Sequence, residues 1–207
     1  MYRSVQEWTV RRTDRYGQGV DTGTGRRAEL LRQVVEYCSA HGIADLSLAP
    51  MGEALGTSKR MLLYYFGSRD RLIAETIIAS RPDVTELFHH VHDTESLTEA
   101  AHVLWRTITD RDTRGPIRIL FQVLALAPTQ PERYAAVARE AIAAMIDPLL
   151  PVYRRLGYPE PEAAARASLL ISGLRGLCLD HLVTGDDARL DAAATALIAA
   201  AAAPLRG

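Results

Sequence analysis

The chain has 207 residues, enough for one large domain or for a small domain joined to a larger one. Apolar residues make up 48% of it, charged residues 24%, and the formal net charge is −1, a composition typical of a soluble globular protein. There is no run of about 18 apolar residues, which argues against a membrane span, and the polar first 25 residues do not resemble a secretory signal.

Charge is unevenly distributed along the chain. Residues 1–72 carry 11 Arg and Lys against 8 Asp and Glu, whereas residues 73–207 carry 13 against 17. A basic first part and an acidic remainder indicate that any polyanion would contact the first part. The only cysteines, Cys38 and Cys178, lack metal-ligand spacing and fit free thiols in a reducing compartment, so we expect a cytoplasmic protein.

The chain is predicted to be all-α, because proline and glycine fall mostly between segments with helical periodicity and no alternating strand pattern is sustained. Residues 1–25 contain four glycines and no periodic face, so we expect a flexible arm there. Within the helical part, Ser96 with Glu99 predicts a capping box, and Pro148 and Pro151 should bend or end one helix. The predicted helices span about 26–41, 47–55, 58–66, 68–82, 96–110, 116–127, 131–154, 160–183 and 187–203.

Residues 56–72 read GTSKRMLLYYFGSRDRL and contain Lys59, the only lysine of the chain. A short helix, a turn at Gly56 and a second short helix that starts with hydroxyl and basic residues form the helix-turn-helix pattern. Such side chains can reach base edges or phosphates when the helix enters the major groove of double-stranded DNA. The alternative is a solvated helix face with two core aromatics. The predicted DNA-contacting residues are Ser47, Thr57, Ser58, Lys59, Arg60, Tyr64, Tyr65 and Arg69.

From about Ala28 to Leu72 the sequence resembles the DNA-binding domain of the TetR family of bacterial transcriptional regulators. The matching positions are Gly42, Ser47, Met51-Gly52, Gly56, Ser58-Lys59, Tyr65-Phe66, Ser68-Arg69 and Leu72. Two positions differ. Leu63 stands where the family usually has a DNA-contacting tyrosine, so Tyr64 or Tyr65 would supply that contact. Met51-Gly52 replaces a common isoleucine-alanine pair, and glycine costs a helix about 1 kcal/mol against alanine.

The resemblance implies three parts: a flexible arm (1–25), a helix-turn-helix domain with its linking helix (26–82), and a helical effector-binding and dimerisation domain (83–207). It also implies a homodimer formed through the last two helices. The penultimate helix contains SLLISGLRGLCLDHL, which is apolar nearly all round, and the last helix is rich in alanine. The alternative for the penultimate helix is the buried core of a monomer.

Polar and aromatic side chains within the apolar helices of residues 83–207 are the candidates for an effector pocket. A buried, unpaired Arg175 would need an anion or another acceptor, although an ion pair with Asp180 or with a carboxylate across the dimer is an equal alternative. Aromatics such as Trp105 and Phe121 are more often core residues. The full candidate set is His102, Trp105, Arg118, Phe121, Gln122, Arg175, Cys178 and His181.

Two other chemistries deserve a test against the structure. Cys178 and His181 lie three residues apart on one helical face, but no third catalytic group is recognisable, and apolar surroundings raise a thiol pKa. His89, His90 and His92 could bind zinc with Asp93 or His102, although a surface cluster of histidines is the better explanation. We therefore expect no enzyme activity, no metal site and no cofactor beyond an unidentified small-molecule effector.

The sequence thus predicts a cytoplasmic, homodimeric DNA-binding transcriptional regulator, a repressor that a small-molecule effector releases from its operator, with no membrane association. Arg11, Arg12 and Arg15 of the arm would allow a minor-groove contact. Two alternatives remain open: an all-α ligand carrier or enzyme without DNA function, and a helical module that binds only protein.

Overall fold

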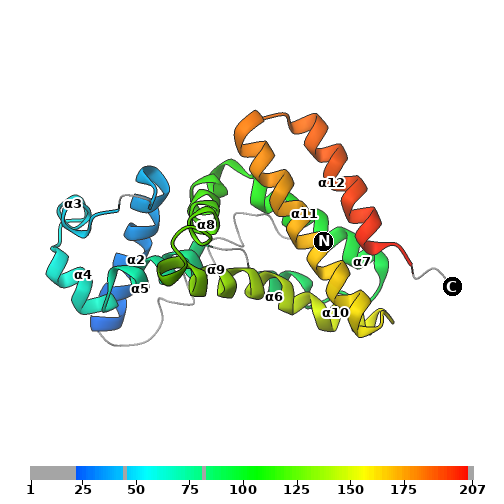
Figure 1. Cartoon of the computed structure of the whole chain (residues 1–207), viewed down its shortest axis with the longest axis horizontal. Helices are drawn as coiled ribbons and strands as arrows, with labels where there is room; N and C mark the ends of the chain where they lie inside the picture. The colour runs from blue at the N-terminus through cyan, green and yellow to red at the C-terminus, as the bar shows by residue number, and fades with distance from the viewer. Residues whose placement is uncertain (1–21, 44–45, 81–82, 205–207) are drawn as a thin grey trace.

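The computed structural model describes residues 22–43, 46–80 and 83–204, and these ranges contain helices and no strand (Figure 1). The predicted all-α class is therefore confirmed for the described residues. The helices are α2 (Thr22–His41), α3 (Leu48–Ala54), α4 (Lys59–Phe66), α5 (Arg69–Ser80), α6 (Val84–Phe88), α7 (Thr94–Thr109), α8 (Arg114–Leu126), α9 (Pro131–Ile146), α10 (Leu150–Arg155), α11 (Glu160–Thr184) and α12 (Asp187–Ala202), with short 3₁₀ turns at Arg111–Thr113 and Asp147–Leu149.

Helices α2 to α5 form a small unit, called the head below, at one end of the elongated molecule (Figure 1). Apolar side chains spaced three or four residues apart on α2 point into its core, and they meet residues of α3, α4 and α5 there. The core residues of the head are Leu30, Val34, Cys38, Ile43, Leu46, Leu48, Met51, Leu62, Phe66, Leu72, Ile73 and Ile77.

Helices α6 to α12 form the larger unit, called the body below. Within it α7, α11 and α12 pack together, and α8 and α9 lie on the side that faces the head (Figure 1). The head rests on these two helices through α2, which packs along α8, and through α5, which contacts both. The boundary that we predicted between residues 82 and 83 lies between α5 and α6.

Helix boundaries differ from the predicted ones at a few places. The first helix begins at Thr22 rather than at about Arg26. The predicted capping box of Ser96 with Glu99 is wrong: Asp93 is the N-cap, its side chain accepts a hydrogen bond from the Ser96 backbone N–H at 2.7 Å, and Ser96 completes the box as the third helical residue. Helix α6, capped by Asp83, was not predicted.

The prolines at positions 148 and 151 act as expected. Helix α9 ends at Ile146, a 3₁₀ turn follows, and α10 begins at Leu150, so the predicted helix over 131–154 is interrupted. Proline lacks the backbone N–H that would continue the helical hydrogen bonds, which explains the break. The change of direction brings Val152 and Tyr153 of α10 into the core of the body.

Candidate nucleic-acid interface and effector cavity

The close packing of α3 against the start of α4 depends on Gly52. A Cβ atom at this position would lie 2.9 Å from the carbonyl carbon of Ser58 and 3.0 Å from the backbone nitrogen of Lys59. The turn between the two helices passes through Gly56, which has a φ of +62°, a left-handed conformation that glycine adopts without strain. Glycine at these two positions therefore fixes how α4 projects from the head.

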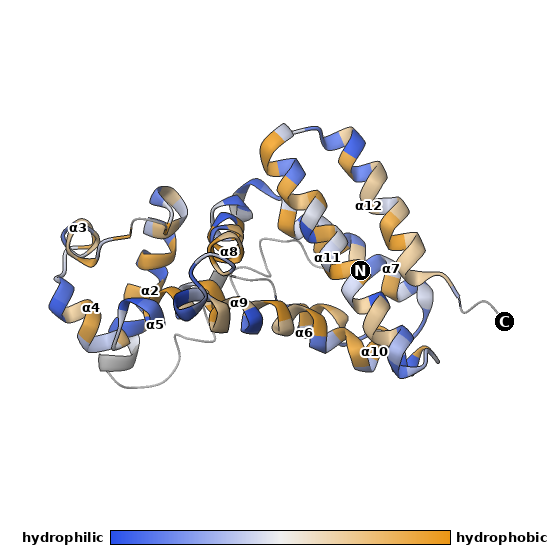
Figure 2. Cartoon of the chain, viewed as in Figure 1, coloured by the Kyte–Doolittle hydropathy of each residue, from blue (hydrophilic) through white to orange (hydrophobic). Residues whose placement is uncertain are grey.

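Helix α4 has a buried face and an exposed face. Leu62 and Phe66 are buried in the head, whereas Lys59, Arg60 and Tyr64 are exposed, Tyr64 to 76% of its surface. No carboxylate of the described residues pairs with Lys59 or Arg60. Figure 2 shows the hydrophilic start of α4 at the free end of the head. Unpaired cations on an exposed, protruding helix are available to an anionic partner.

The start of α4 is capped by Ser58. The backbone of Ser58 is extended, and its hydroxyl accepts a hydrogen bond from the Met61 N–H at 3.2 Å. The preceding Thr57 is half-buried, and its N–H donates to the Gly52 carbonyl at 2.8 Å. Both residues lie at the positively polarised N-terminal end of the helix, where backbone N–H groups favour an anion.

Tyr64 and Tyr65 lie on different faces of α4. The ring of Tyr64 projects outward and meets that of Tyr65 edge-to-face at 5.3 Å. Tyr65 is half-buried, and its carbonyl accepts a hydrogen bond from Arg27 Nε at 3.2 Å. Arg27 also stacks over the Phe66 ring at 4.9 Å and pairs with Glu75, which ties α2, α4 and α5 together. Of the two tyrosines, Tyr64 is therefore the exposed one.

Arg69 has a structural contact that sequence reasoning missed. Its Nε donates to the Leu46 carbonyl at 2.8 Å and its Nη2 to the Ile43 carbonyl at 3.2 Å, and only 18% of the side chain is exposed. These bonds hold Ile43 and Leu46 against the start of α5. Ser47 lies in the same region. It is the exposed N-cap residue of α3, but its side chain makes no capping hydrogen bond. Whether Arg69 or Ser47 also contacts phosphate stays a prediction.

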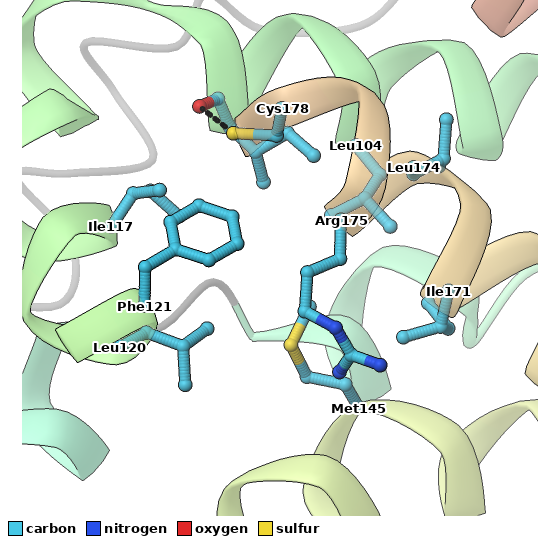
Figure 3. Close-up of a pocket in the computed structure, with 10 residues that line it drawn as sticks. Leu104, Ile117, Leu120, Phe121, Met145, Ile171, Leu174, Arg175 and Cys178 are labelled. Atoms are coloured by element: carbon cyan, nitrogen blue, oxygen red, sulfur yellow. Dashed lines mark hydrogen bonds between the residues drawn. The ribbon is translucent and has the colours of Figure 1, made fainter. Parts of the chain in front are cut away.

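A small cavity of about 20 Å³ lies in the body between α7, α8, α9 and α11 (Figure 3). Three of the predicted pocket residues line it: Phe121, Arg175 and Cys178. Its other lining residues are aliphatic side chains and one methionine: Leu104, Ile108, Ile117, Leu120, Met145, Ile171 and Leu174. The cavity is therefore apolar, with one charged side chain at its wall.

The other predicted pocket residues do not line this cavity. Trp105 is buried and donates from Nε1 to Asp191 at 2.7 Å, which joins α7 to α12. His181 is buried and its Nε2 lies 2.6 Å from a carboxylate oxygen of Asp187, across the turn between α11 and α12. His102 is half-buried and Arg118 is exposed.

Gln122 lies at the junction of head and body. Its Oε1 accepts a hydrogen bond from the Ile43 N–H at 2.7 Å, and its amide group sits directly against Gly42. Gly115, at the other end of α8, contacts Ser39 so closely that a Cβ there would be 2.5 Å from the serine Cβ. Helix α8 thus carries cavity residues on one face, and on another it contacts Ser39 of α2 and the two residues that follow α2.

The thiol of Cys178 has an environment unsuited to nucleophilic chemistry. It donates to the Ile108 carbonyl at 3.3 Å, and burial raises the pKa of the thiol to about 12. A neutral thiol is a poor nucleophile, and His181 is engaged by Asp187 instead. The structure therefore does not favour a thiolate–imidazole pair.

The histidines at positions 89, 90 and 92 are exposed. The rings of His89 and His90 meet edge-to-face at 4.8 Å, and His92 lies 3.3 Å from the Asp93 carboxylate. Within the described ranges, no three His, Cys, Asp or Glu residues come together as metal ligands would. None of the helices in these ranges has the length and apolar content that a membrane crossing requires.

Comparisons with known proteins place this fold among bacterial regulators. No protein-family model and no curated protein matches the sequence. The structure, however, matches Salmonella enterica GusR with a TM-score of 0.68 and 17% identity over 89% of this chain and 97% of that one. It also matches a regulator of Mesorhizobium loti assigned to the TetR family, with a TM-score of 0.67 and 16% identity over 88% and 97% of the two chains.

A third match is a TetR-family transcription regulator from Marinobacter aquaeolei VT8, with a TM-score of 0.51 and 19% identity over 84% and 94% of the two chains. The chain thus has the fold of the TetR-family regulators, as the residues between Ala28 and Leu72 predicted. At these identities the similarity establishes the fold, and the function has to be argued from the site.

Proposed function

We propose that the protein is a sequence-specific DNA-binding transcriptional regulator, a repressor that binds its operator through α4 and leaves it when an effector enters the body. The observation that carries this proposal is the exposed face of α4. Lys59, Arg60 and Tyr64 are exposed on a helix whose other face, with Leu62 and Phe66, is buried in the head. The fold shared with transcriptional regulators supports the same assignment.

In this proposal α4 enters the major groove of double-stranded DNA. Lys59 and Arg60 are donors that guanine O6 and N7 or phosphate oxygens accept. Thr57 and Ser58 at the helix start are within the turn that faces the duplex, where helix N-terminal N–H groups favour a phosphate. The Tyr64 hydroxyl would bond a backbone phosphate, the contact predicted for a tyrosine in this helix.

The proposed active form is a homodimer. Exposed side chains on α11 recur every three or four residues, and Leu169, Leu179 and Val183 among them are large and apolar, with exposed fractions of 46%, 47% and 78%. Gly176 lies on this same face with no atom within 4 Å of the position of a Cβ, so a second backbone can approach. The neighbouring face of α12 is mostly alanine. Two heads held in this way would bind half-sites about 34–36 Å apart.

The proposed link between effector and DNA is α8. Ile117, Leu120 and Phe121 line the cavity, while Gln122 on the same helix accepts a hydrogen bond from Ile43, two residues after the end of α2. A ligand that displaces cavity side chains would move α8 and with it the head. A coupling of about 1–3 kcal/mol, common for allosteric proteins, changes operator affinity by about 5- to 150-fold.

The proposal is tested by selecting binding sites from a random library of duplex DNA with the full chain. We expect enrichment of a two-fold symmetric sequence whose half-sites are about one helical turn apart. A matched selection with a Lys59→Ala, Arg60→Ala double variant should enrich nothing, because both exposed cations of α4 are lost while the buried face is unchanged. Recovery of no preferred sequence by the wild-type protein would contradict the proposal.

A further inference from the structure

Among the residues that the structure describes, Arg175 is the only charged one that lines the cavity in the body. It extends from α11 toward Met145 of α9, and Phe121 of α8 stands on the other side of the space (Figure 3). Its Nη2 donates to the Ser172 hydroxyl at 2.9 Å. Its Nη1 is buried and has no hydrogen-bond partner. One guanidinium nitrogen, with two N–H groups, therefore has no acceptor at the wall of an otherwise apolar cavity.

The charge of Arg175 is likewise uncompensated. Among the described residues no carboxylate lies within ion-pair distance of the guanidinium, and Asp180, the partner considered from the sequence, pairs with Arg189 at 2.9 Å. Burial lowers the pKa of Arg175, which shows that its surroundings disfavour the charge. Burying a charged donor without a partner costs free energy that an anion in the cavity would recover.

We propose that this cavity binds an aliphatic monocarboxylate, with the carboxylate on Arg175 Nη1 and the hydrocarbon chain among Ile117, Phe121 and Met145. A planar guanidinium matches a carboxylate in geometry and charge. A phosphate group fits less well, because the described lining residues include no second cation to balance a second negative charge. The apolar remainder of the wall suits a chain of CH₂ groups and offers nothing to a sugar or other polyol.

The cavity is too small for the proposed ligand unless some of its lining side chains move. About 20 Å³ holds little more than one water molecule. A carboxylate with several carbon atoms must therefore displace side chains that line the cavity, among them the flexible thioether of Met145 and the ring of Phe121. Phe121 belongs to α8, the helix that contacts the head. The ligand therefore favours a conformation in which the side chains of α8 at the cavity are arranged differently from those seen here.

The ligand assignment is tested by calorimetric titration of the full chain with butanoate, hexanoate and octanoate, and with the alcohols of equal chain length. We expect the carboxylates to bind at least about tenfold more tightly than the matched alcohols. Affinity should rise about three- to fourfold for each added CH₂ group until the cavity is filled. Equal affinity of octanoate and octan-1-ol would overturn the role of Arg175. Tighter binding of octyl phosphate than of octanoate would overturn the choice of a carboxylate.

Variants of Arg175 test whether its guanidinium binds the carboxylate. Arg175→Met retains a long apolar side chain and should lower octanoate affinity at least about tenfold while leaving octan-1-ol unchanged. Arg175→Lys keeps the charge and should lose less. Arg118→Met, at an exposed arginine of α8 outside the cavity, is the matched control and should bind octanoate as the wild type does. If Arg175→Met instead dissociates the dimer with octanoate affinity unchanged, the guanidinium pairs with the partner subunit and the proposal is wrong.

The regulatory part of the inference depends on the proposed function, whereas the binding part does not. Octanoate should lower the affinity for the selected operator in the wild type and have no effect on Arg175→Met at the same concentration. Failure to bind any duplex sequence would contradict the proposed function alone. Specific DNA binding without calorimetric binding of any carboxylate would contradict the ligand assignment alone.

Discussion

At the scale of single residues, Lys59 has the simplest expected effect, because its side chain is exposed and pairs with no carboxylate among the described residues. Lys59→Ala should leave the free energy of unfolding nearly unchanged and weaken operator binding. It should also reduce the salt dependence of log K by about 0.9 per lost phosphate contact. Binding by fluorescence anisotropy at several salt concentrations measures both quantities. Lys59→Arg, which retains the charge, is the control and should keep the salt slope.

Arg69 is expected to act on stability first. Arg69→Met removes the donors for the carbonyls of Leu46 and Ile43, and we expect the free energy of unfolding to fall by about 1–3 kcal/mol. Urea denaturation measures this directly. Arg71→Met is the matched control: its side chain is 70% exposed and its ion pair with Glu75 is 3.3 Å long, so the loss should be under about 1 kcal/mol. An Arg69→Met protein as stable as Arg71→Met would contradict the structural role.

The two thiols should be protected in the folded protein. Burial raises the pKa of Cys38 and of Cys178 from 9.0 to about 12, so the folded state holds these protons more tightly than the unfolded chain. Their contribution to stability is fully present below about pH 9 and is lost as pH rises toward 12. Alkylation near pH 8 should be more than about a hundredfold slower in native than in denatured protein. Comparable rates in both states would contradict the burial of the thiols.

Some side-chain roles that depend on nearby residues could be predicted from the sequence. Ser68, the first residue of the helix predicted over 68–82, accepts a hydrogen bond from the Arg71 N–H at 3.1 Å and so caps α5. The contacts of Arg69 and Gln122 could not be predicted, because their partners are backbone groups 23 to 79 residues away. Only the packing of α2 against α5 and α8 brings these groups together.

At the scale of elements, Gly52 provides a test in which two effects have opposite signs. Gly52→Ala should favour the helical state of α3 by up to about 1 kcal/mol. The new Cβ, however, would lie 2.9 Å from the Ser58 backbone, and such overpacking costs about 1–3 kcal/mol. We therefore expect a net loss of stability. In the control, Gly25→Ala on α2, nothing lies within 4 Å, and stability should stay equal or rise. Denaturant unfolding distinguishes the two outcomes, and a more stable Gly52→Ala protein would contradict the close packing.

The periodicity of the sequence predicted the positions of the long helices, but it did not predict short helices or the exact ends of helices. The break at Pro148 and the separation of the helices predicted over 160–183 and 187–203 could be predicted, because proline and glycine interrupt helices for local reasons. Helix α6 has only five residues, too few for a periodic pattern, and it was missed. The start of α7 was placed too late because Ser96 resembles a cap, although Asp93 is the better acceptor for the first turn.

At the scale of the whole molecule, the exposed apolar face of α11 predicts self-association. Leu179→Asp places a charge in the proposed interface and should convert the dimer to a monomer, which light scattering coupled to size exclusion measures. Because a single head binds one half-site, operator affinity should fall as well. Ala125→Asp, at an exposed position of α8, is the control and should remain dimeric. A Leu179→Asp dimer with wild-type affinity would place the interface elsewhere.

The cavity was only partly predictable from the sequence. Phe121, Arg175 and Cys178 were identified as polar or aromatic residues of apolar helices, and they do line the cavity. Trp105 and His181 satisfied the same criterion, but they pair with Asp191 and Asp187 of α12 instead. Sequence periodicity shows which helix face is buried and gives no information on which neighbouring helix covers it.

The central claim is that the exposed face of α4 binds a specific DNA sequence. The most direct test is anisotropy of the selected operator duplex with the full chain at about 50 and about 200 mM salt, in the presence of excess random duplex. We predict binding that resists the random competitor and weakens markedly at the higher salt concentration. A folded dimer that binds the operator no better than the random duplex at either concentration would contradict the claim and would favour a helical ligand carrier.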